Sequence, residues 1–381
     1  PVAVELWNGE ALSCAGPPTV TLKINKPQTL INLAHPSLGK LARAYVERGF
    51  DFLGKTRDII GMGERLCAHD VLENKGSRLR NWWRHSKLAD RKNIRHHYDV
   101  SNDFYGLWLD AKRIYSCAYF KTENDSLDQA QSQKLEHICR KLNLQAGERF
   151  LDIGCGWGGL ICHAAKTYGV TAHGITLSEE QLAFAKEKIK RLGLEERVTV
   201  ELKDYSMMAG QFDKIASIGM YEHIGLKNIP GYMQKMQQLL SEDGLFLNHA
   251  IARRAPKQGW FKKRMRPEQK AIAKYIFPGG ELDDIGHSIF AMERAGFEIL
   301  DVEAWRLHYA RTCKLWCERL TANREEAIRH VGEQKYRIWV AYLAGVSLAF
   351  SRGTLRIFQT LVSKNAKRPP AIPPTRADLY R

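Results

Sequence analysis

A glycine-rich turn in the middle of the chain is the first segment whose residues could do chemistry. Residues 151–159 read LDIGCGWGG, so an apolar stretch runs directly into a run of glycines. Glycine adopts positive φ without strain and lets the backbone approach a bound molecule closely. A turn of this kind at the carboxyl end of a strand is a common ligand site. The segment therefore predicts a small-molecule site at the edge of a parallel sheet.

An acidic side chain accompanies this turn. Asp152 precedes the first glycine by two residues, in a D-x-G-x-G pattern that is typical of S-adenosylmethionine-dependent methyltransferases. This resemblance implies that the carboxylate helps to position the methionine end of the cofactor. The next expected strand, residues 171–177, ends without the carboxylate that commonly holds ribose hydroxyls. We expect backbone and hydroxyl groups of Thr176, Leu177 and Gln181 to replace it.

The elements around the turn alternate between strand and helix. From residue 126 onward, strand-length apolar stretches are separated by helical patterns of about ten to fifteen residues. This alternation predicts a mostly parallel, doubly wound α/β sheet, and the methyltransferase resemblance makes it a Rossmann-like domain. Ser126 is expected to cap one helix, and Ser178 with Gln181 to form a capping box ahead of another.

Three segments are expected along the chain. Residues 1–74 predict a small N-terminal α+β domain, residues 75–95 a basic linker, and residues 96–381 the methyltransferase catalytic domain. Within the first domain, residues 18–24 alternate in the manner of a strand. Residues 37–65 predict helices that break at three glycines, Gly49, Gly54 and Gly61.

The charge balance predicts an anionic partner. Lysine and arginine number 58 against 42 aspartate and glutamate, which gives a formal net charge of +16. Such an excess favours nucleic acid, an anionic membrane surface or a phosphorylated substrate. Residues 253–274 are rich in basic side chains, with Trp260, Phe261 and Met265 interleaved. Because apolar side chains among cations suit a membrane interface, we expect this segment to dock on an anionic leaflet.

Cysteine usage and apolar stretches indicate where the protein works. The eight cysteines include no C-x-x-C pair, which favours a reduced protein without a metal site. The first residues lack the basic start and apolar core of a signal peptide. The longest uncharged apolar stretch, Ile338 to Phe350, is shorter than the about 20 residues that a bilayer span needs. We therefore expect a cytoplasmic protein that is peripheral to the inner face of the membrane.

Several segments in a fixed order resemble one family. They are HYDVSNDFYGLWLD at 97–110, YSCAYF at 115–120, LDIGCGWGG, GITLSEEQ, SIGMYEHIG at 217–225, NHAI at 248–251 and HYARTCKLW at 308–316. Together they are similar to the cyclopropane-fatty-acyl-phospholipid synthases, with the mycolic acid cyclopropane synthases as relatives. The N-terminal domain also resembles that of the bacterial phospholipid enzymes.

The resemblance implies two groups of site residues. A bound bicarbonate ion is expected among Cys117, Glu222, His249 and Tyr309, with a main-chain contact near Ile218. No metal is expected. The residues expected around S-adenosylmethionine, with the last two at the adenine edge, are Tyr115, Ser116, Asp152, Gly154, Gly156, Gly158, Thr176, Leu177, Gln181, Tyr205 and Ser206.

The activity implied is methyl transfer from S-adenosylmethionine to a cis double bond in an acyl chain of an unsaturated phospholipid. The carbocation that results loses a proton from the new methyl group and closes to a cyclopropane. An alkene is a weak nucleophile, so the methyl donor must be held in line and the cation shielded from water. Bicarbonate suits the role of base, and a carboxylate beside that anion predicts a perturbed pKa for Glu222. A homodimer through the N-terminal domain is also expected.

Two other functions remain open from the sequence. A related methyltransferase could make a methyl-branched lipid or methylate a small amine, since such enzymes are similar through the core. The positive charge alone would also suit a nucleic-acid-binding or RNA-modifying protein. Against that function, the sequence contains no RNP, KH or zinc motif. Phospholipid at an anionic membrane surface, without nucleic acid, is therefore the expected partner.

Overall fold

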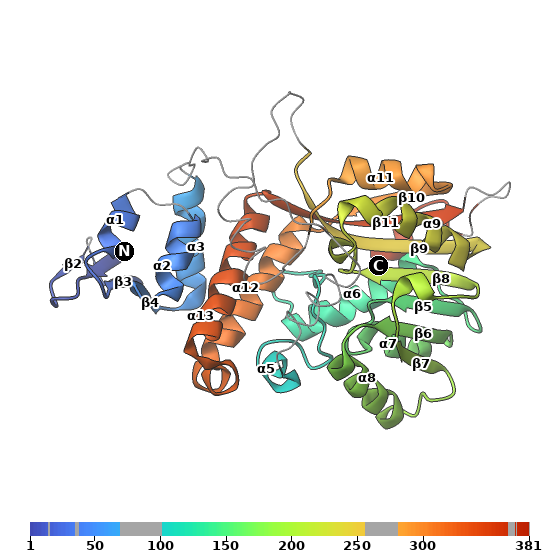
Figure 1. Cartoon of the computed structure of the whole chain (residues 1–381), viewed down its shortest axis with the longest axis horizontal. Coiled ribbons are helices and arrows are strands. Elements are labelled where there is room, and N and C mark those ends of the chain that lie inside the picture. Colours follow the sequence, from blue (N-terminus) through green and yellow to red (C-terminus); the bar gives the residue numbers. More distant parts are fainter. Residues whose placement is uncertain are drawn as a thin grey trace.

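The chain folds around two separate β-sheets, a small one near the N-terminus and a large one in the rest of the chain (Figure 1). The computed structural model describes residues 1–13, 16–34, 38–68, 101–255, 281–364, 370 and 372–380. Among these residues, no helix combines the length and apolarity that crossing a bilayer requires. The expected linker at 75–95, both domain boundaries that flank it, and residues 256–274 of the basic segment lie outside the described residues. These boundaries stay predictions.

The N-terminal unit is a four-stranded sheet with three helices. Its elements are β1 (Val2–Glu5), β2 (Ala11–Ser13), β3 (Val20–Ile24), α1 (Thr29–Ala34), α2 (Leu38–Val46), β4 (Phe50–Gly54) and α3 (Thr56–Ala68). The strand order is β2-β1-β3-β4.

The strand expected near residue 20 is confirmed, but the expectation of helices alone over residues 37–65 is wrong in two places. Residues 50–54 form strand β4, which pairs antiparallel with β3, because Phe50 and Phe52 give the segment a strand-like alternation. Helix α3 also continues through Gly61 without a break. Glycine in a helix costs only about 1 kcal/mol, and the rest of α3 compensates for it.

The large sheet has seven strands in the order β10-β11-β9-β8-β5-β6-β7. The strands are β5 (Arg149–Ile153), β6 (Thr171–Thr176), β7 (Val198–Leu202), β8 (Phe212–Ile218), β9 (Leu240–Arg253), β10 (Phe297–Ala304) and β11 (Leu355–Lys364). The β7-β6-β5-β8-β9 part is parallel, whereas β11 pairs antiparallel with both β9 and β10. The mostly parallel, doubly wound sheet predicted from the sequence is confirmed.

Helices cover both faces of this sheet. The α-helices described after residue 100 are α5 (Asn102–Gly106), α6 (Leu127–Lys141), α7 (Gly159–Tyr168), α8 (Glu179–Arg191), α9 (Ile229–Leu239), α11 (Ile285–Arg294), α12 (Arg306–Ala322) and α13 (Arg324–Ser351). Side chains of α6, α7 and α8 pack with Phe150 and Leu247 on one face. Side chains of α9 and α11 pack with Leu151 and Phe246 on the other. Neighbouring residues of one strand thus enter opposite cores.

Two serine caps were expected, and one of them differs in detail. Ser126 caps α6 and forms a full capping box with Gln129. Ser178 caps α8 by accepting a hydrogen bond from the Gln181 backbone N–H. The Gln181 side chain does not complete a box, because its Oε1 accepts a hydrogen bond from the Thr176 hydroxyl at 2.8 Å. That contact joins the start of α8 to the end of β6.

Helices α12 and α13 lie between the two sheets, and α13 holds the N-terminal unit (Figure 1). The buried Arg337 guanidinium donates to the backbone oxygens of Tyr45 and Phe50 at 2.7 and 2.9 Å, and to Asp51 Oδ1 at 2.6 Å. It also stacks over the Tyr45 ring. Five donors in a planar fork allow one arginine to satisfy several acceptors at once. Arg337 thereby helps to hold the N-terminal unit on α13, together with the Ser351–Glu64 hydrogen bond.

Candidate active site

A cavity lies at the carboxyl ends of β5, β6 and β8, where ligands bind in open α/β sheets. Of the residues expected around the cofactor, nine line this cavity, namely Tyr115, Ser116, Asp152, Gly154, Gly156, Thr176, Leu177, Gln181 and Tyr205. Two do not line it. Gly158 begins α7 with a φ of 75°, and a side chain there would press on Ala185. Both the N–H and the hydroxyl of Ser206 bind Asp204 instead.

The glycine turn leaves the floor of the cavity open. Gly154 and Gly156 have φ angles of 82° and 54°, which side-chain-bearing residues rarely adopt. No heavy atom lies within 4 Å of the position that a Cβ of Gly156 would occupy. The N–H groups of Gly154 and Cys155 both donate to the Ile175 carbonyl, which ties the turn to β6. A flat molecule can therefore approach this backbone closely.

A buried carboxylate and a buried ammonium face the same cavity. Burial raises the pKa of Asp152 to about 7, while the charge of Lys134 opposes that increase. Burial likewise lowers the pKa of Lys134 to about 8. Asp152 Oδ1 has no hydrogen-bond partner among the described residues. A buried polar atom without a partner is costly unless a ligand satisfies it, so this carboxylate fits a cofactor with a positively charged group.

Lys134 is a cavity residue that sequence reasoning missed. It lies on the buried side of α6 together with Leu127, Gln131 and Ile138. The signal was present, because these positions follow the three- and four-residue spacing of one helix face. A lysine in such a stripe is unexpected unless it has a polar neighbour.

The four residues expected around bicarbonate lie beside the cavity rather than in its lining. Cys117, Glu222, His249 and Tyr309 are all buried, with at most 9% of each residue exposed. Three of them adjoin residues of the cavity wall along the chain or across the sheet. Cys117 follows Ser116, Glu222 precedes His223, and His249 pairs with Ile218 in the parallel register of β8 and β9.

Trp305 brings three of these residues together. The Cys117 thiol points to the Trp305 carbonyl oxygen at 3.9 Å, and the ring of His249 meets the Trp305 ring edge-to-face at 5.2 Å. Tyr309 follows one helical turn later, and its N–H donates to that same carbonyl. Trp305 was not expected in the site from the sequence, because nothing in its local pattern distinguishes it from a core tryptophan.

Glu222 supplies an acceptor on this wall. Its Oε1 accepts a hydrogen bond from the backbone N–H of Ile251, two residues after His249 on β9. Burial raises the pKa of Glu222 to about 7, whereas the sequence predicted a pKa perturbed by a neighbouring anion. Its Oε2 has no hydrogen-bond partner among the described residues. Near neutral pH this carboxyl group can therefore donate or accept a hydrogen bond.

His249 contributes a neutral imidazole. Its Nδ1 lies 3.0 Å from the side-chain nitrogen of Gln359, which stands opposite it on β11. Burial lowers the pKa of His249 well below its ordinary value, so the ring carries no charge at neutral pH. Its Nε2 has no hydrogen-bond partner in the described part of the chain. When Gln359 donates to Nδ1, the proton lies on Nε2 and is available to an anion.

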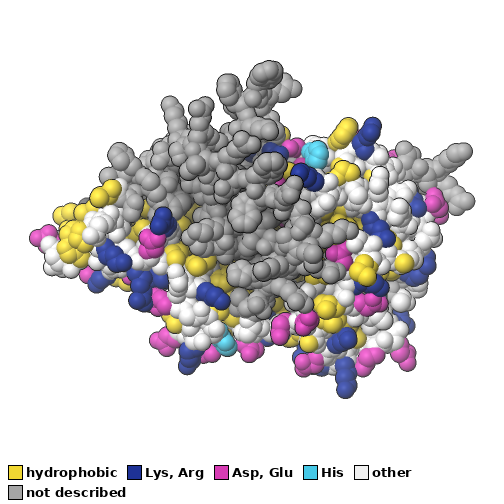
Figure 2. All heavy atoms as spheres, viewed as in Figure 1, with side chains coloured by type: hydrophobic (Ala, Val, Ile, Leu, Met, Phe, Trp, Pro, Cys, Tyr) yellow, Lys and Arg dark blue, Asp and Glu magenta, His cyan; other side chains and the backbone are white. Residues whose placement is uncertain are grey.

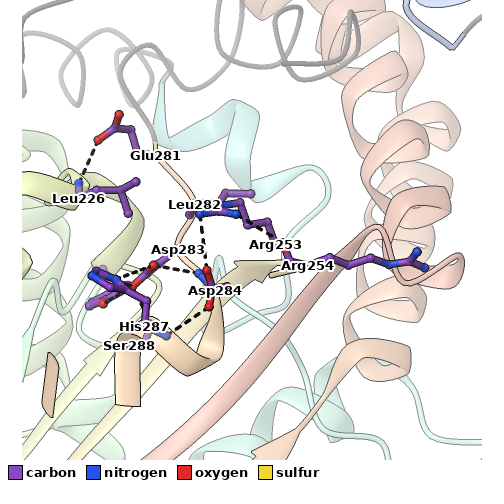
Figure 3. Close-up of polar contacts among 10 residues, drawn as sticks. Leu226, Arg253, Arg254, Glu281, Leu282, Asp283, Asp284, His287 and Ser288 are labelled. Carbon is purple, nitrogen blue, oxygen red and sulfur yellow. Dashed lines mark hydrogen bonds and ion pairs between the residues drawn. The ribbon is translucent and has the colours of Figure 1, made fainter. Parts of the chain in front are cut away.

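Buried Asp283 anchors the turn that carries Glu222, and Figure 3 shows its contacts with His287 and Ser288. The hydroxyl groups of Tyr221 and Ser288 donate to Asp283 Oδ2, each at 2.9 Å. His287 Nδ1 contacts Asp283 Oδ1 at 2.8 Å. Since Tyr221 directly precedes Glu222 in the 3-10 turn 221–223, these contacts fix the backbone from which the Glu222 side chain projects.

A hydrogen bond to the main chain restrains the same turn from a second direction. The N–H of Glu281 donates to the Glu222 carbonyl oxygen at 3.3 Å. The segment that holds Glu281 and Asp283 also binds the end of β9, because the Arg253 N–H donates to the Asp283 carbonyl at 2.8 Å. The Arg253 side chain donates to the Leu282 carbonyl (Figure 3). The turn, β9 and residues 281–284 thus form one connected wall.

Comparisons with known proteins show the family of this chain. A family model described as mycolic acid cyclopropane synthetase matches residues 85–360. The chain belongs to this family. It is 39% identical to a probable fatty acid methyltransferase of Pseudomonas putida, over 100% of this chain and 96% of that protein. It is 33% identical to the cyclopropane-fatty-acyl-phospholipid synthase of Escherichia coli (strain K12), over 96% and 94%.

Solved structures of the mycolic acid cyclopropane synthetase family have the same architecture. A cyclopropane synthase from Mycobacterium tuberculosis superposes with a TM-score of 0.68 at 32% identity, over 72% of this chain and 98% of that chain. A mycolic acid cyclopropane synthase complexed with SAH and CTAB gives 0.68 at 33% identity over the same shares. The chain described here is therefore an S-adenosylmethionine-dependent methyltransferase, as its sequence predicted.

Coclaurine N-methyltransferase has the same fold. Its TM-score is 0.63 at 21% identity, over 85% of this chain and 98% of that chain. At that identity the likeness concerns the fold alone.

The hydrogen bonds of the Cys117 thiol go to carbonyl oxygens and not to a base among the described residues, so we expect no covalent catalysis at this residue. Burial raises its pKa well above the ordinary value, and the thiol points to carbonyl oxygens. A thiolate, rather than a thiol, is the nucleophile in covalent cysteine chemistry. Cys117→Ser should therefore retain methyl-transfer turnover within about tenfold of the wild type. Turnover with labelled S-adenosylmethionine measures this, and a lipid adduct on Cys117 in intact-protein mass spectra would contradict it.

Proposed function

We propose that this enzyme converts cis double bonds in the acyl chains of unsaturated phospholipids to cyclopropanes. The observation that carries the proposal is that two sites lie next to each other, on either side of the cavity wall. One is the cavity at the glycine turn, and the other is the buried group around Trp305, where Glu222 Oε2 and His249 Nε2 lack partners among the described residues. A donor site beside a buried proton-accepting site is what methylation followed by deprotonation requires.

The cavity residues fit S-adenosylmethionine. This cofactor, when bound, supplies a methyl group on a positively charged sulfur. Asp152 and the open backbone of Gly156 would hold its methionine end. Thr176 and Gln181, joined by their 2.8 Å hydrogen bond, would present hydroxyl and amide groups to the ribose. Tyr205 would flank the adenine.

Trp316 contacts both Tyr115 of the cavity wall and Tyr309 of the second group. Tyr115 packs against Trp108 and Trp316 at ring-centroid distances of 5.4 and 5.3 Å, and Tyr309 packs against Trp316 and Phe350 at 6.0 and 4.6 Å. Ring faces stabilise a cation, and an apolar enclosure keeps water from capturing it. A carbocation on the acyl chain would therefore persist long enough to lose a proton and close the ring.

Bicarbonate fits the second group of residues, where it would supply a base that alkylation does not consume. His249 Nε2, as a neutral donor, and a protonated Glu222 could each donate a hydrogen bond to its oxygens. Burial raises the pKa of the Tyr309 hydroxyl well above its ordinary value, so Tyr309 is a third donor. Donors that stay protonated orient an anion without competing for the substrate proton.

A second candidate function is the formation of a methyl-branched fatty acyl chain. The 39% identity to a probable fatty acid methyltransferase over the whole chain favours it. Such a product requires a hydride after the methyl transfer instead of the loss of a proton. Glu222 Oε2 and His249 Nε2 are buried and lack partners among the described residues, which favours proton removal, so we place ring closure first.

The product distinguishes the two candidates. Unsaturated phospholipid vesicles incubated with the enzyme and S-adenosylmethionine should gain the mass of one CH₂ per reacted chain, with loss of the double bond and no need for a reductant. Mass spectrometry of the acyl chains, with and without added bicarbonate, measures this outcome. A saturated chain that carries a methyl branch would instead support the fatty acid methyltransferase.

Replacement of Glu222 should separate binding from turnover. If Glu222 orients the base, Glu222→Gln should bind S-adenosylmethionine almost normally and lose about 10²–10⁴-fold in turnover. Calorimetric titration and single-turnover rates measure the two quantities. Glu281→Gln is the matched control, because Glu281 accepts a hydrogen bond from the Leu226 N–H on the same wall and an amide can still accept it. A comparable loss of cofactor affinity in Glu222→Gln would place this residue in the cofactor site.

A membrane surface is the proposed place of reaction, on the cytoplasmic side. The net charge of +16 and the basic composition of residues 253–274 support an anionic leaflet. Within Figure 2, the described basic and acidic side chains are interspersed on the visible face. We further propose a homodimer through the N-terminal unit, where the exposed apolar side chains include Trp7, Leu12, Leu30, Ile31 and Leu53.

Charge neutralisation in residues 253–274 should weaken membrane binding. Each basic residue near an anionic surface contributes about 1 kcal/mol of attraction that fades with salt. A variant with Lys262, Lys263, Arg264 and Arg266 changed to glutamine should lose at least about tenfold in affinity for anionic vesicles at low salt, with unchanged affinity for S-adenosylmethionine. Vesicle co-sedimentation measures the difference.

The matched control removes the same charge elsewhere. Lys166, Lys186, Lys190 and Arg191 are exposed on α7 and α8, and their change to glutamine lowers the net charge equally. This control should bind vesicles more tightly than the first variant. Equal binding by the two variants would mean that residues 253–274 contribute to membrane binding only through the net charge of the protein.

A further inference from the structure

Lys134 has no assigned role, yet it is a buried cation in the wall of the cofactor cavity. Only 2% of the residue is exposed, and its Nζ donates a hydrogen bond to the Ser116 hydroxyl oxygen at 2.8 Å. Ser116 is the one hydrogen-bond partner of this ammonium within the described ranges. An ammonium group has three donors, so two remain for a further acceptor.

The neighbouring acids leave Lys134 free to bind a ligand. Asp110 accepts hydrogen bonds from the backbone N–H groups of Lys112 and Ile114, at 2.9 and 2.8 Å, so backbone donors already satisfy its carboxylate. Asp152 interacts with Lys134 electrostatically, but no hydrogen bond joins the two among the described residues. The cavity wall thus presents one negative and one positive group side by side.

This pair matches the chemistry of a zwitterion. The methionine end of S-adenosylmethionine carries an ammonium and a carboxylate on one carbon. Burial of two opposite charges is favourable only where each meets an opposite charge or a hydrogen-bond donor. Asp152 alone would satisfy the ammonium but not the carboxylate. Among the described cations that line the cavity, Arg113 donates to the Asn102 carbonyl and Lys203 pairs with Glu201, whereas Lys134 binds only the neutral Ser116 hydroxyl.

We propose that Lys134 binds the carboxylate of the cofactor's methionine end, while Asp152 binds its ammonium and Ser116 holds the Lys134 side chain in position. The inference rests on the assignment of this cavity to S-adenosylmethionine within the proposed function. It does not depend on which lipid product the enzyme makes. α6 therefore supplies a cofactor-binding residue as well as part of the core.

Two further contacts of α6 fit this role. The amide nitrogen of Gln131, one turn before Lys134, donates to the carbonyl oxygens of Ser116 and Ile114 at 3.0 and 3.3 Å. The segment 114–116 lines the cavity, so α6 fixes its backbone and its side chains together. Gln131 acts here as a positioning residue for Ser116.

The test compares two ligands that differ only in the carboxylate. S-adenosylhomocysteine and its decarboxylated analogue are titrated into the full chain by calorimetry. The wild type should bind S-adenosylhomocysteine about 10–100-fold more tightly than the analogue, as expected for a charge-assisted hydrogen bond in a buried site. In Lys134→Met this ratio should fall toward one. The wild-type ratio needs no variant, so the test does not depend on the folding of Lys134→Met.

Two controls separate binding from a structural role. 5′-Deoxy-5′-methylthioadenosine lacks the amino-acid end, so its affinity should be equal in the wild type and Lys134→Met. Lys214→Met removes another buried lysine, which pairs with Glu148 at the opposite end of β8 and does not line the cavity. It should leave the ratio unchanged.

Two results would overturn the inference. One is a wild-type ratio near one, and the other is an equal loss for all three ligands in Lys134→Met, which would mean that Lys134 only supports the wall. Lipid analysis of the wild type reports on the proposed function separately. A methyl-branched product with the expected ligand ratio would refute ring closure and leave the role of Lys134 intact.

Discussion

The parallel pairing of β8 with β9 is the constraint on which the whole site depends. In this register Ile218 lies opposite His249, and the N–H of Gly219 donates to the His249 carbonyl oxygen at 2.9 Å. Ile218 belongs to the cavity wall, whereas His249 belongs to the buried group around Trp305. A slip of one residue would turn His249 to the opposite face of the sheet. The register therefore brings the cavity wall next to the buried group around Trp305.

The sequence predicted those parts of the molecule whose local pattern is decisive. The glycine turn, the alternation of strands and helices and the serine caps follow from short-range stereochemistry. The family segments supplied the two groups of expected site residues, whose roles stay predictions. Lys134 and Trp305 were missed because only tertiary packing brings them to the site. Strand β4 was missed because its pairing with β3 depends on residues far along the chain. Gly158 and Ser206 were expected at the cavity but do not line it, because Gly158 packs against Ala185 of α8 and Ser206 binds Asp204.

Burial sets the protonation of nearly every polar group in the site. It raises the pKa of Asp152 and Glu222 to about 7, lowers the pKa of Lys134 to about 8, and lowers the pKa of His249 well below its ordinary value. Groups of opposite type thus approach one another in proton affinity near neutral pH. In such an environment small changes in the surroundings move protons, which would suit the proton removal that we propose.

The position of β11 in the sheet has a consequence for folding during synthesis. This strand, Leu355–Lys364, lies between β9 and β10, so a late segment of the chain occupies an interior position. It supplies Gln359 to His249. When the glycine turn and its helices have left the ribosome, β11, which joins β9 to β10, has not yet been synthesised. Until residue 364 emerges, the edge of β9 stays unpaired and open to pairing with other chains. Catalytic competence and protection from aggregation therefore arrive together, late in synthesis.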